Sequence, residues 1–204
     1  MIGLRRGEIC LEPHNPKWAL LYERERARLA AALGDHVLDL QHVGSTAIPG
    51  IRAKPILDIA ADVASYEAAA VCIAPLEALG YTYRGENGIP RRRYFVRRTP
   101  DGETTLVHLH MLEAHSAEWE NHLLFRDYLR AHPQDAQAYQ ALKEELMARY
   151  PRDRGAYTEG KGAFVARILV QARLWQASAA ASARAASSSE DEVDALSEDA
   201  RGSI

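Results

Sequence analysis

Apolar and polar positions alternate with a helical period near the start of the chain. Apolar side chains recur at intervals of three, four or seven residues, namely Trp18, Leu21, Tyr22, Leu29 and Leu33. The pair Asn15-Pro16 is a typical helix start, with Asn as the cap and Pro in the first turn. Gly34 is a typical helix end. The pattern therefore predicts one amphipathic helix between these signals.

Beyond Gly34 the pattern predicts strands, interrupted by one helix that Gly80 ends. Turn sequences rich in Gly, Asn, Pro and Asp separate the last three strands, and the second of these turns, at 99–102, is a good hairpin signal. The predicted helix covers residues 66–79, and the predicted strands cover 37–43, 55–63, 81–84, 92–98 and 104–112.

The pattern returns to a helical period from Ser116 onward. It predicts helices at 116–131, 133–149 and about 158–176. Residues 177–204 are rich in Ala and Ser, then acidic, with too few large apolar residues to offset chain entropy. The sequence thus predicts one α+β domain over 1–176, a mixed sheet with flanking helices and a helical C-terminal half, and a disordered tail over 177–204.

Composition narrows the class of protein. The formal net charge is −3, but it is unevenly distributed. Residues 177–204 hold two basic and six acidic residues, so residues 1–176 carry a net charge of only +1. That balance disfavours a broad nucleic-acid surface. Cys10 and Cys72 are too few for a disulfide framework, and we expect both to be reduced and buried. With no signal peptide or membrane span in the sequence, we expect a soluble, cytoplasmic protein with no membrane partner.

The most informative stretch runs from His42 through the turn Gly44-Ser45 to a second apolar strand. A Gly-Ser turn after a strand presents backbone N–H groups and a hydroxyl to a phosphate. Asp58 stands between Leu57 and Ile59, so its side chain points to the opposite face of that strand. Asp58 is either a ligand for a metal or substrate, or a structural carboxylate bonded to Arg or to backbone amides.

Two further strands carry candidate chemistry. His108 and His110 share one strand face and can both ligate a metal or contact a phosphoryl oxygen, or can simply be hydrogen-bonded to their neighbours. They approach Asp58 if strand 104–112 lies beside strand 55–63. Arg93 lies on a strand face that can clamp a phosphate, whereas Arg92 and Arg98 on the other face are as well explained by a charged edge strand.

One apparent phosphate motif fails. Residues 155–162 fit G-x-x-x-x-G-K, but Gly162 occupies the position of the metal-binding Ser or Thr. The preceding residues are no buried strand, so we reject an ATPase P-loop. Lys161 near a helix start can still reach an anion.

Taken together, these motifs resemble the GrpB family, whose members look like nucleotidyltransferase-fold proteins. The matching pieces cover about 40–170 and occur in the family's order: 42–46 with 49–50, 54–59, 93–95, 108–110, 125–130, and Tyr157 with Gly160-Lys161. In some proteins a domain of this family is fused to dephospho-CoA kinase as an accessory domain. The resemblance implies that the Gly-Ser turn holds phosphate, with contributions from His42, Gly44, Ser45, Thr46, Lys54, Arg93 and Lys161.

The same resemblance implies a divalent metal, Mg²⁺, Mn²⁺ or Zn²⁺, near Asp58. Active nucleotidyltransferases hold metals with two carboxylates two residues apart, but here the second position is Ala60. A cluster of Asp58, His108 and His110 suits Zn²⁺ or Mn²⁺ better than Mg²⁺. We therefore expect a protein that binds a nucleotide or another small phosphorylated ligand. The alternative is an active metal-dependent transferase in which Asp58, His108 and His110 are catalytic.

Overall fold

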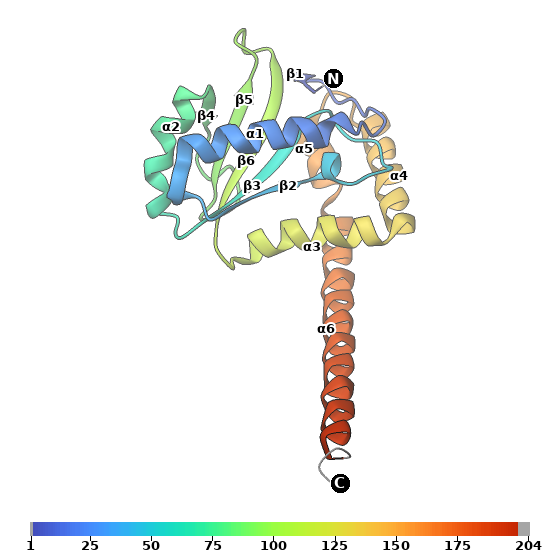
Figure 1. The fold of residues 1–204 in the computed structure, drawn as a ribbon. Helices are drawn as coiled ribbons and strands as arrows, with labels where there is room; N and C mark the ends of the chain where they lie inside the picture. The colour runs from blue at the N-terminus through green and yellow to red at the C-terminus, as the bar shows by residue number, and fades with distance from the viewer. Residues whose placement is uncertain (1, 200–204) are drawn as a thin grey trace.

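A mixed sheet of six strands forms the centre of the part of the chain that the structure describes (Figure 1). The computed structural model covers residues 2–199, with side chains described for 2–182. The strands pair in the order β2-β3-β6-β5-β4, and the short β1 pairs with β6. Strands β3 and β6 are parallel, and the other pairs are antiparallel. Their bounds are β1 (Leu4–Arg5), β2 (Asp39–Val43), β3 (Leu57–Val63), β4 (Tyr81–Tyr83), β5 (Arg93–Arg98) and β6 (Thr104–Glu113).

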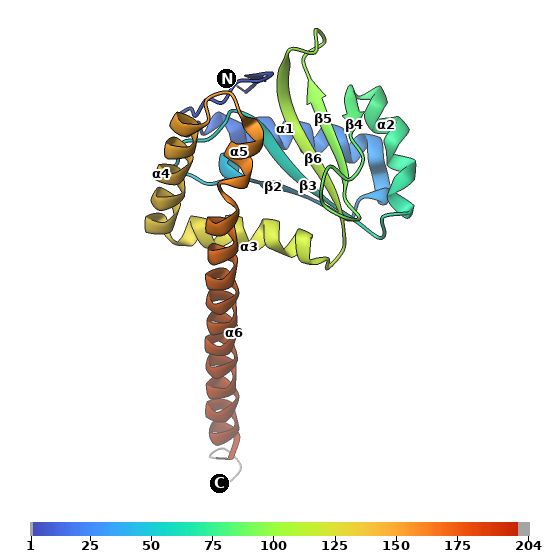
Figure 2. The ribbon, with the colours of Figure 1, turned by 180° about the vertical axis from the view of Figure 1, so that it is seen from behind.

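Helices cover both faces of the sheet. Helices α1 and α2 lie on one face, and α3 to α6 lie on the other, as the two opposite views show (Figures 1 and 2). Three short 3₁₀ segments, η1 (Gly34–His36), η2 (Ser45–Ala47) and η3 (Ala68–Cys72), complete the connections. The helices are α1 (Lys17–Leu33), α2 (Ile73–Ala78), α3 (Ala117–Ala131), α4 (Pro133–Arg149), α5 (Arg154–Glu159) and α6 (Gly162–Asp199).

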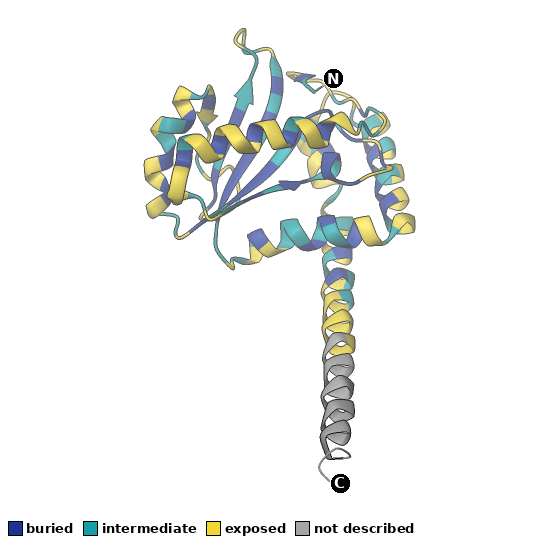
Figure 3. Ribbon diagram, in the orientation of Figure 1, coloured by how far each residue is buried: buried dark blue, intermediate teal, exposed yellow. Residues whose placement is uncertain are grey.

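Strand alternation divides the apolar side chains into separate clusters. Leu57 and Ile59 of β3, with Leu109 of β6, pack in the main core with Trp18 and Leu29 of α1. A second cluster joins α3, α4 and α6 to the segment around Ile48 and Ile51. Burial follows this division: the strands are largely buried, and the described part of α6 past Trp175 is exposed (Figure 3). The residues between Leu57 and Ile59 and on either side of Leu109 therefore face away from α1.

The predicted α+β fold is confirmed, including the mixed sheet and the helical C-terminal half. The predicted strands agree within two residues at each end, and Asn15 caps α1 by accepting a hydrogen bond from the Lys17 N–H at 3.0 Å. The pairing that the sequence left open is resolved, because β6 lies beside β3.

Three expectations need correction. The helix expected at 66–79 is instead η3 followed by α2, because Pro75 has no N–H to continue a helix from residue 66 and is accommodated in the first turn of α2. The helix expected at 158–176 is broken into α5 and α6 at Gly160-Lys161, and α6 continues to Asp199. Cys72 is buried as expected, but Cys10 is exposed.

The predicted disorder of the tail over 177–204 stays a prediction, and residues 200–204 lie outside the described part of the chain. The side chains of residues 176–182 are all exposed. Within residues 2–199, no helix has both the length and the apolar content needed to cross a membrane.

Candidate functional site

A cavity of about 760 Å³ lies on the face of the sheet opposite α1. Its walls come from the β2–η2 turn, β3, β5, β6 and the helices α3, α4, α5 and α6. Eight of the residues predicted as site residues line it, namely Gly44, Ser45, Thr46, Lys54, Asp58, His108, His110 and Lys161. Residues from four separate parts of the sequence therefore meet in one place.

Gly44 allows the turn to pass close to Asp58. Its φ of +68° lies in the left-handed region, which favours glycine. A Cβ on Gly44 would also lie only 2.9 Å from the Asp58 Cβ and would overlap its carboxylate. The register explains the approach, because Val43 of β2 pairs with Asp58 of β3. Gly44 is thus required by both backbone conformation and space.

Asp58 is held by two histidines of the neighbouring strand. The register places His108 beside Asp58. His108 Nδ1 lies 3.0 Å from Asp58 Oδ1 and donates a hydrogen bond to it, and His110 Nε2 lies 3.8 Å from the same oxygen. Burial favours a raised pKa for the Asp58 carboxyl, but hydrogen bonding to the two histidines outweighs it and holds that pKa well below its usual range. Asp58 is therefore an ionised carboxylate.

Arg92 fixes the orientation of His110. Its Nη1 lies 3.2 Å from His110 Nδ1. Because a guanidinium can only donate, His110 Nδ1 must be the acceptor, so the proton of the neutral ring lies on Nε2, toward Asp58. Burial lowers the pKa of His110, which agrees with a neutral ring. In this tautomer Nδ1 is occupied by Arg92 and Nε2 carries the proton, so neither nitrogen offers a lone pair to a metal.

Residue 60, where a second metal-binding carboxylate would stand, does not open to the cavity. Ala60 is fully buried in a small apolar cluster with Val43, Leu112 and Trp119 of α3. Among the described residues, no group of three or more His, Cys, Asp or Glu side chains is arranged to hold a metal ion. The oxygen donors near Asp58 thus do not fit Mg²⁺, which needs several oxygen ligands.

Lysines gather at the other end of the cavity. The chain has four lysines, and three of them, Lys54, Lys143 and Lys161, line this cavity. The Nζ atoms of Lys54 and Lys161 lie 4.3 and 5.0 Å from the centre of the Tyr157 ring. Within the described part of the chain, none of the three forms an ion pair with a carboxylate. These ammonium groups are stabilised by aromatic rings and, for Lys143, by a hydrogen bond to the Arg52 carbonyl.

Burial weakens the protonation of these lysines, and repulsion from nearby cations adds to it at Lys54 and Lys143. Burial, followed by the nearby charges of Lys161 and Arg154, lowers the pKa of Lys54 to about 7. Burial and the charge of Lys161 lower the pKa of Lys143 to about 7, and burial lowers that of Lys161. An anion placed among them relieves the repulsion and restores the charges.

Two predicted phosphate ligands lie elsewhere. Arg93 is on the other face of the sheet, where its Nε donates to the Tyr66 carbonyl at 2.9 Å and its guanidinium stacks over the Tyr66 ring. His42 is buried behind the turn, with Nε2 3.0 Å from Thr46 Oγ1 and its ring stacked on Tyr22. The structure places Arg92, from the opposite strand face, at the cavity instead of Arg93.

Several lining residues were not predicted. They include Tyr139 and Lys143 of α4, Arg154 of α5 and His122 of α3, whose pKa burial lowers to about 3. Lys143 had a detectable signal, because it falls in the buried stripe of α4 between Tyr139 and Leu146. A lysine in an apolar stripe is unusual enough to indicate a site. His122 and Arg154 carried no such signal.

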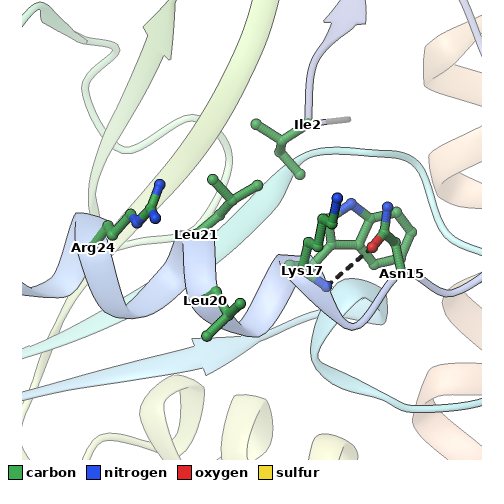
Figure 4. Close-up of a pocket in the computed structure, with 7 residues that line it drawn as sticks. Ile2, Asn15, Lys17, Leu20, Leu21 and Arg24 are labelled. Carbon is green, nitrogen blue, oxygen red and sulfur yellow. Dashed lines mark hydrogen bonds between the residues drawn. The ribbon is translucent and has the colours of Figure 1, made fainter.

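A second hollow, of about 560 Å³, lies at the start of α1 (Figure 4). Ile2, Leu20 and Leu21 line it, with the amide of Asn15 and the long side chains of Lys17 and Arg24 at its rim. It brings no histidine, carboxylate or cysteine to its lining. We therefore assign the candidate chemistry to the larger cavity.

Comparisons with known proteins settle the family. A profile described as GrpB protein matches residues 8–171. The chain belongs to the GrpB family. A solved structure of the conserved protein GrpB from Enterococcus faecalis is 32% identical, with a TM-score of 0.74 over 81% of this chain and 99% of that one. The predicted family resemblance is thereby confirmed, and the fold is that of a GrpB protein.

Curated relatives differ in length from this GrpB protein. The UPF0157 protein YqkA of Bacillus subtilis (strain 168) is 41% identical over 172 residues, which are 84% of this chain and 49% of YqkA. A dephospho-CoA kinase of Mycolicibacterium paratuberculosis is 30% identical over 78% of this chain and 44% of the kinase. The chain thus spans about half the length of these relatives, and its similarity to the kinase covers only part of that protein.

Proposed function

We propose that this GrpB protein binds a small phosphorylated ligand, of about the size of a nucleotide, in the 760 Å³ cavity. The observation that carries the proposal is the group formed by Lys54, Lys143 and Lys161. Burying ammonium groups without carboxylate partners costs free energy, and an anionic ligand offsets that cost. Lysine is also a common binder of phosphate.

The overall charge of the cavity supports an anion. Five cationic side chains line it, against the carboxylates of Asp58 and Glu118. Asp58 is held by its histidines, and the cationic side chains outnumber the carboxylates. The cationic residues are Lys54, Arg92, Lys143, Arg154 and Lys161. A concave site lined by one sign of charge favours ligands of the opposite sign.

The Gly-Ser turn supports the same proposal, but fewer of its residues are free to contact a phosphate than the sequence predicts. The Thr46 hydroxyl is engaged, because it lies 3.0 Å from His42 Nε2 and donates to the Ile56 carbonyl at 3.3 Å. We therefore assign Thr46 and His42 to shaping the turn. Ser45 lines the cavity, where its hydroxyl interacts with that of Tyr139, and we assign the phosphate contact of the turn to Ser45.

Binding is favoured over phosphoryl or nucleotidyl transfer. The alternative, a metal-dependent transferase using Asp58, His108 and His110, needs ligands for its metals. Ala60 supplies none, and the tautomer of His110 set by Arg92 directs a proton, not a lone pair, toward Asp58. These features support a ligand-binding or accessory role over transfer activity.

Isothermal titration with a panel of nucleoside mono-, di- and triphosphates and inorganic tripolyphosphate tests the proposal. We expect at least one ligand to bind with one-site stoichiometry. Lys143→Met keeps the volume of the side chain and removes its charge, so we expect it to weaken binding roughly tenfold, the effect of losing one charged contact of about 1.4 kcal/mol.

Lys17→Met is the matched control, because Lys17 is exposed on α1 at the edge of the other hollow. We expect this variant to bind like the unmodified protein. Absence of binding to every member of the panel contradicts the proposal, as does an equal loss in both variants.

A further inference from the structure

We propose that the cavity binds its ligand as a metal-free polyphosphate, with the lysines taking the electrostatic role that a divalent cation has in nucleotidyl transfer. The inference rests on the proposed function and deepens it by naming the ionic form of the ligand. It concerns a di- or triphosphate chain, which belongs either to a nucleotide or to an inorganic polyphosphate.

The first argument is the number and placement of the cations. Lys54 and Lys161 lie over the same Tyr157 ring, and Lys143 lies 4.7 Å from the centre of the Tyr139 ring beside them. A terminal phosphoryl group carries roughly two negative charges, and a polyphosphate chain carries more. Three ammonium groups at one end of a cavity therefore match a chain of phosphates better than a single phosphate.

The second argument is the environment of Asp58, where a metal would have to bind. The Arg92 guanidinium contacts His110, and His110 and His108 both face the same carboxylate oxygen. A divalent cation that binds this Oδ1 atom must displace the His108 hydrogen bond and lie close to the positive charge of Arg92. The protein itself therefore already supplies partners for this oxygen of Asp58.

The third argument is that no second carboxylate can join Asp58 from its own strand. Position 60 faces the same side of β3, but it is buried in an apolar cluster with Trp119 of α3. The structure thus fills this position with packing and does not leave it open to the cavity. The presence of Ala60 in place of a second carboxylate agrees with the packing of Trp119 against that position.

A titration of ATP and of tripolyphosphate, each in excess EDTA and each in excess Mg²⁺, tests the inference on the full chain. We expect binding in EDTA, weakened about threefold or more by Mg²⁺, because the metal neutralises the phosphates that the lysines contact. Binding of both ligands indicates recognition of the polyphosphate alone, and binding of ATP alone indicates a nucleotide.

Metal titration gives a readout that does not depend on the ligand. We expect no saturable binding of Mn²⁺ or Zn²⁺ alone to the protein. Binding of ATP that occurs only with Mg²⁺, Mn²⁺ or Zn²⁺ overturns the inference and leaves the proposed function intact. Saturable Zn²⁺ binding that is lost in His108→Asn overturns it as well. Absence of phosphate binding under all conditions overturns the proposed function itself.

Discussion

Lys143 is fully buried and Lys54 is half-buried, unlike an ordinary surface lysine. Each has a pKa lowered to about 7, chiefly by burial. The side chain of Lys17, by contrast, is exposed to solvent. Burying a charged lysine costs free energy when the cavity is empty. An anionic ligand offsets that cost, because it favours the protonated lysine. The lowered pKa values of these two lysines therefore set the cavity apart from the rest of the protein surface.

Proton uptake on ligand binding follows from these two lysines. An anion raises their pKa values, so lysines that are partly neutral above pH 7 become charged when the ligand binds. We expect net uptake of roughly one proton per ligand at about pH 8, less uptake at about pH 6, and affinity that falls as pH rises. Calorimetry in buffers of different ionisation enthalpy measures this uptake. No uptake at the higher pH contradicts the assigned role of the lysines.

The turn between β2 and β3 is the element on which the site depends. It brings the Gly44 backbone against Asp58, and the β3–β6 register then brings the histidines to the same carboxylate. The β2–β3 and β3–β6 registers alone place Gly44 and the two histidines beside Asp58. These pairings therefore position Asp58 and its two histidines together.

Gly44→Ala tests that element. We expect it to lower the free energy of unfolding by about 2–4 kcal/mol, because it combines an unfavourable φ with overlap of the Asp58 side chain. Gly50→Ala is the control, with a φ of +80° and no atom within 4 Å of the added Cβ. Its expected cost is about 1–2 kcal/mol, from φ alone. Equal losses in urea unfolding would show that the close approach to Asp58 is not real.

Much of the fold could be predicted from the sequence, because local signals marked the elements. Asn15, Gly34 and Ser116 act at helix ends as expected, and alternation placed Asp58 on the strand face opposite Leu57. Side-chain direction at the start of β5 was the weak point. Choosing between Arg92 and Arg93 needs the identity of the face that the cavity occupies, and only tertiary packing decides that.

At the scale of the whole molecule, the cavity exists because α3 to α6 fold back over the sheet (Figure 2). The lysines at residues 54, 143 and 161 come from a loop, α4 and the α5–α6 junction, which are far apart in sequence. No local pattern predicts that they meet. The closure of Ala60 by Trp119 is likewise a property of the assembled fold.

The central claim is that these three lysines bind one anionic ligand, and lysine-selective NMR tests it most directly. Only four lysines occur in the chain, so isotope-labelled lysine gives four side-chain signals with Lys17 as an internal control. On addition of ATP or tripolyphosphate in EDTA, we expect the signals of Lys54, Lys143 and Lys161 to shift with one shared dissociation constant while that of Lys17 stays. Shifts of all four signals alike, or of none, contradict the account.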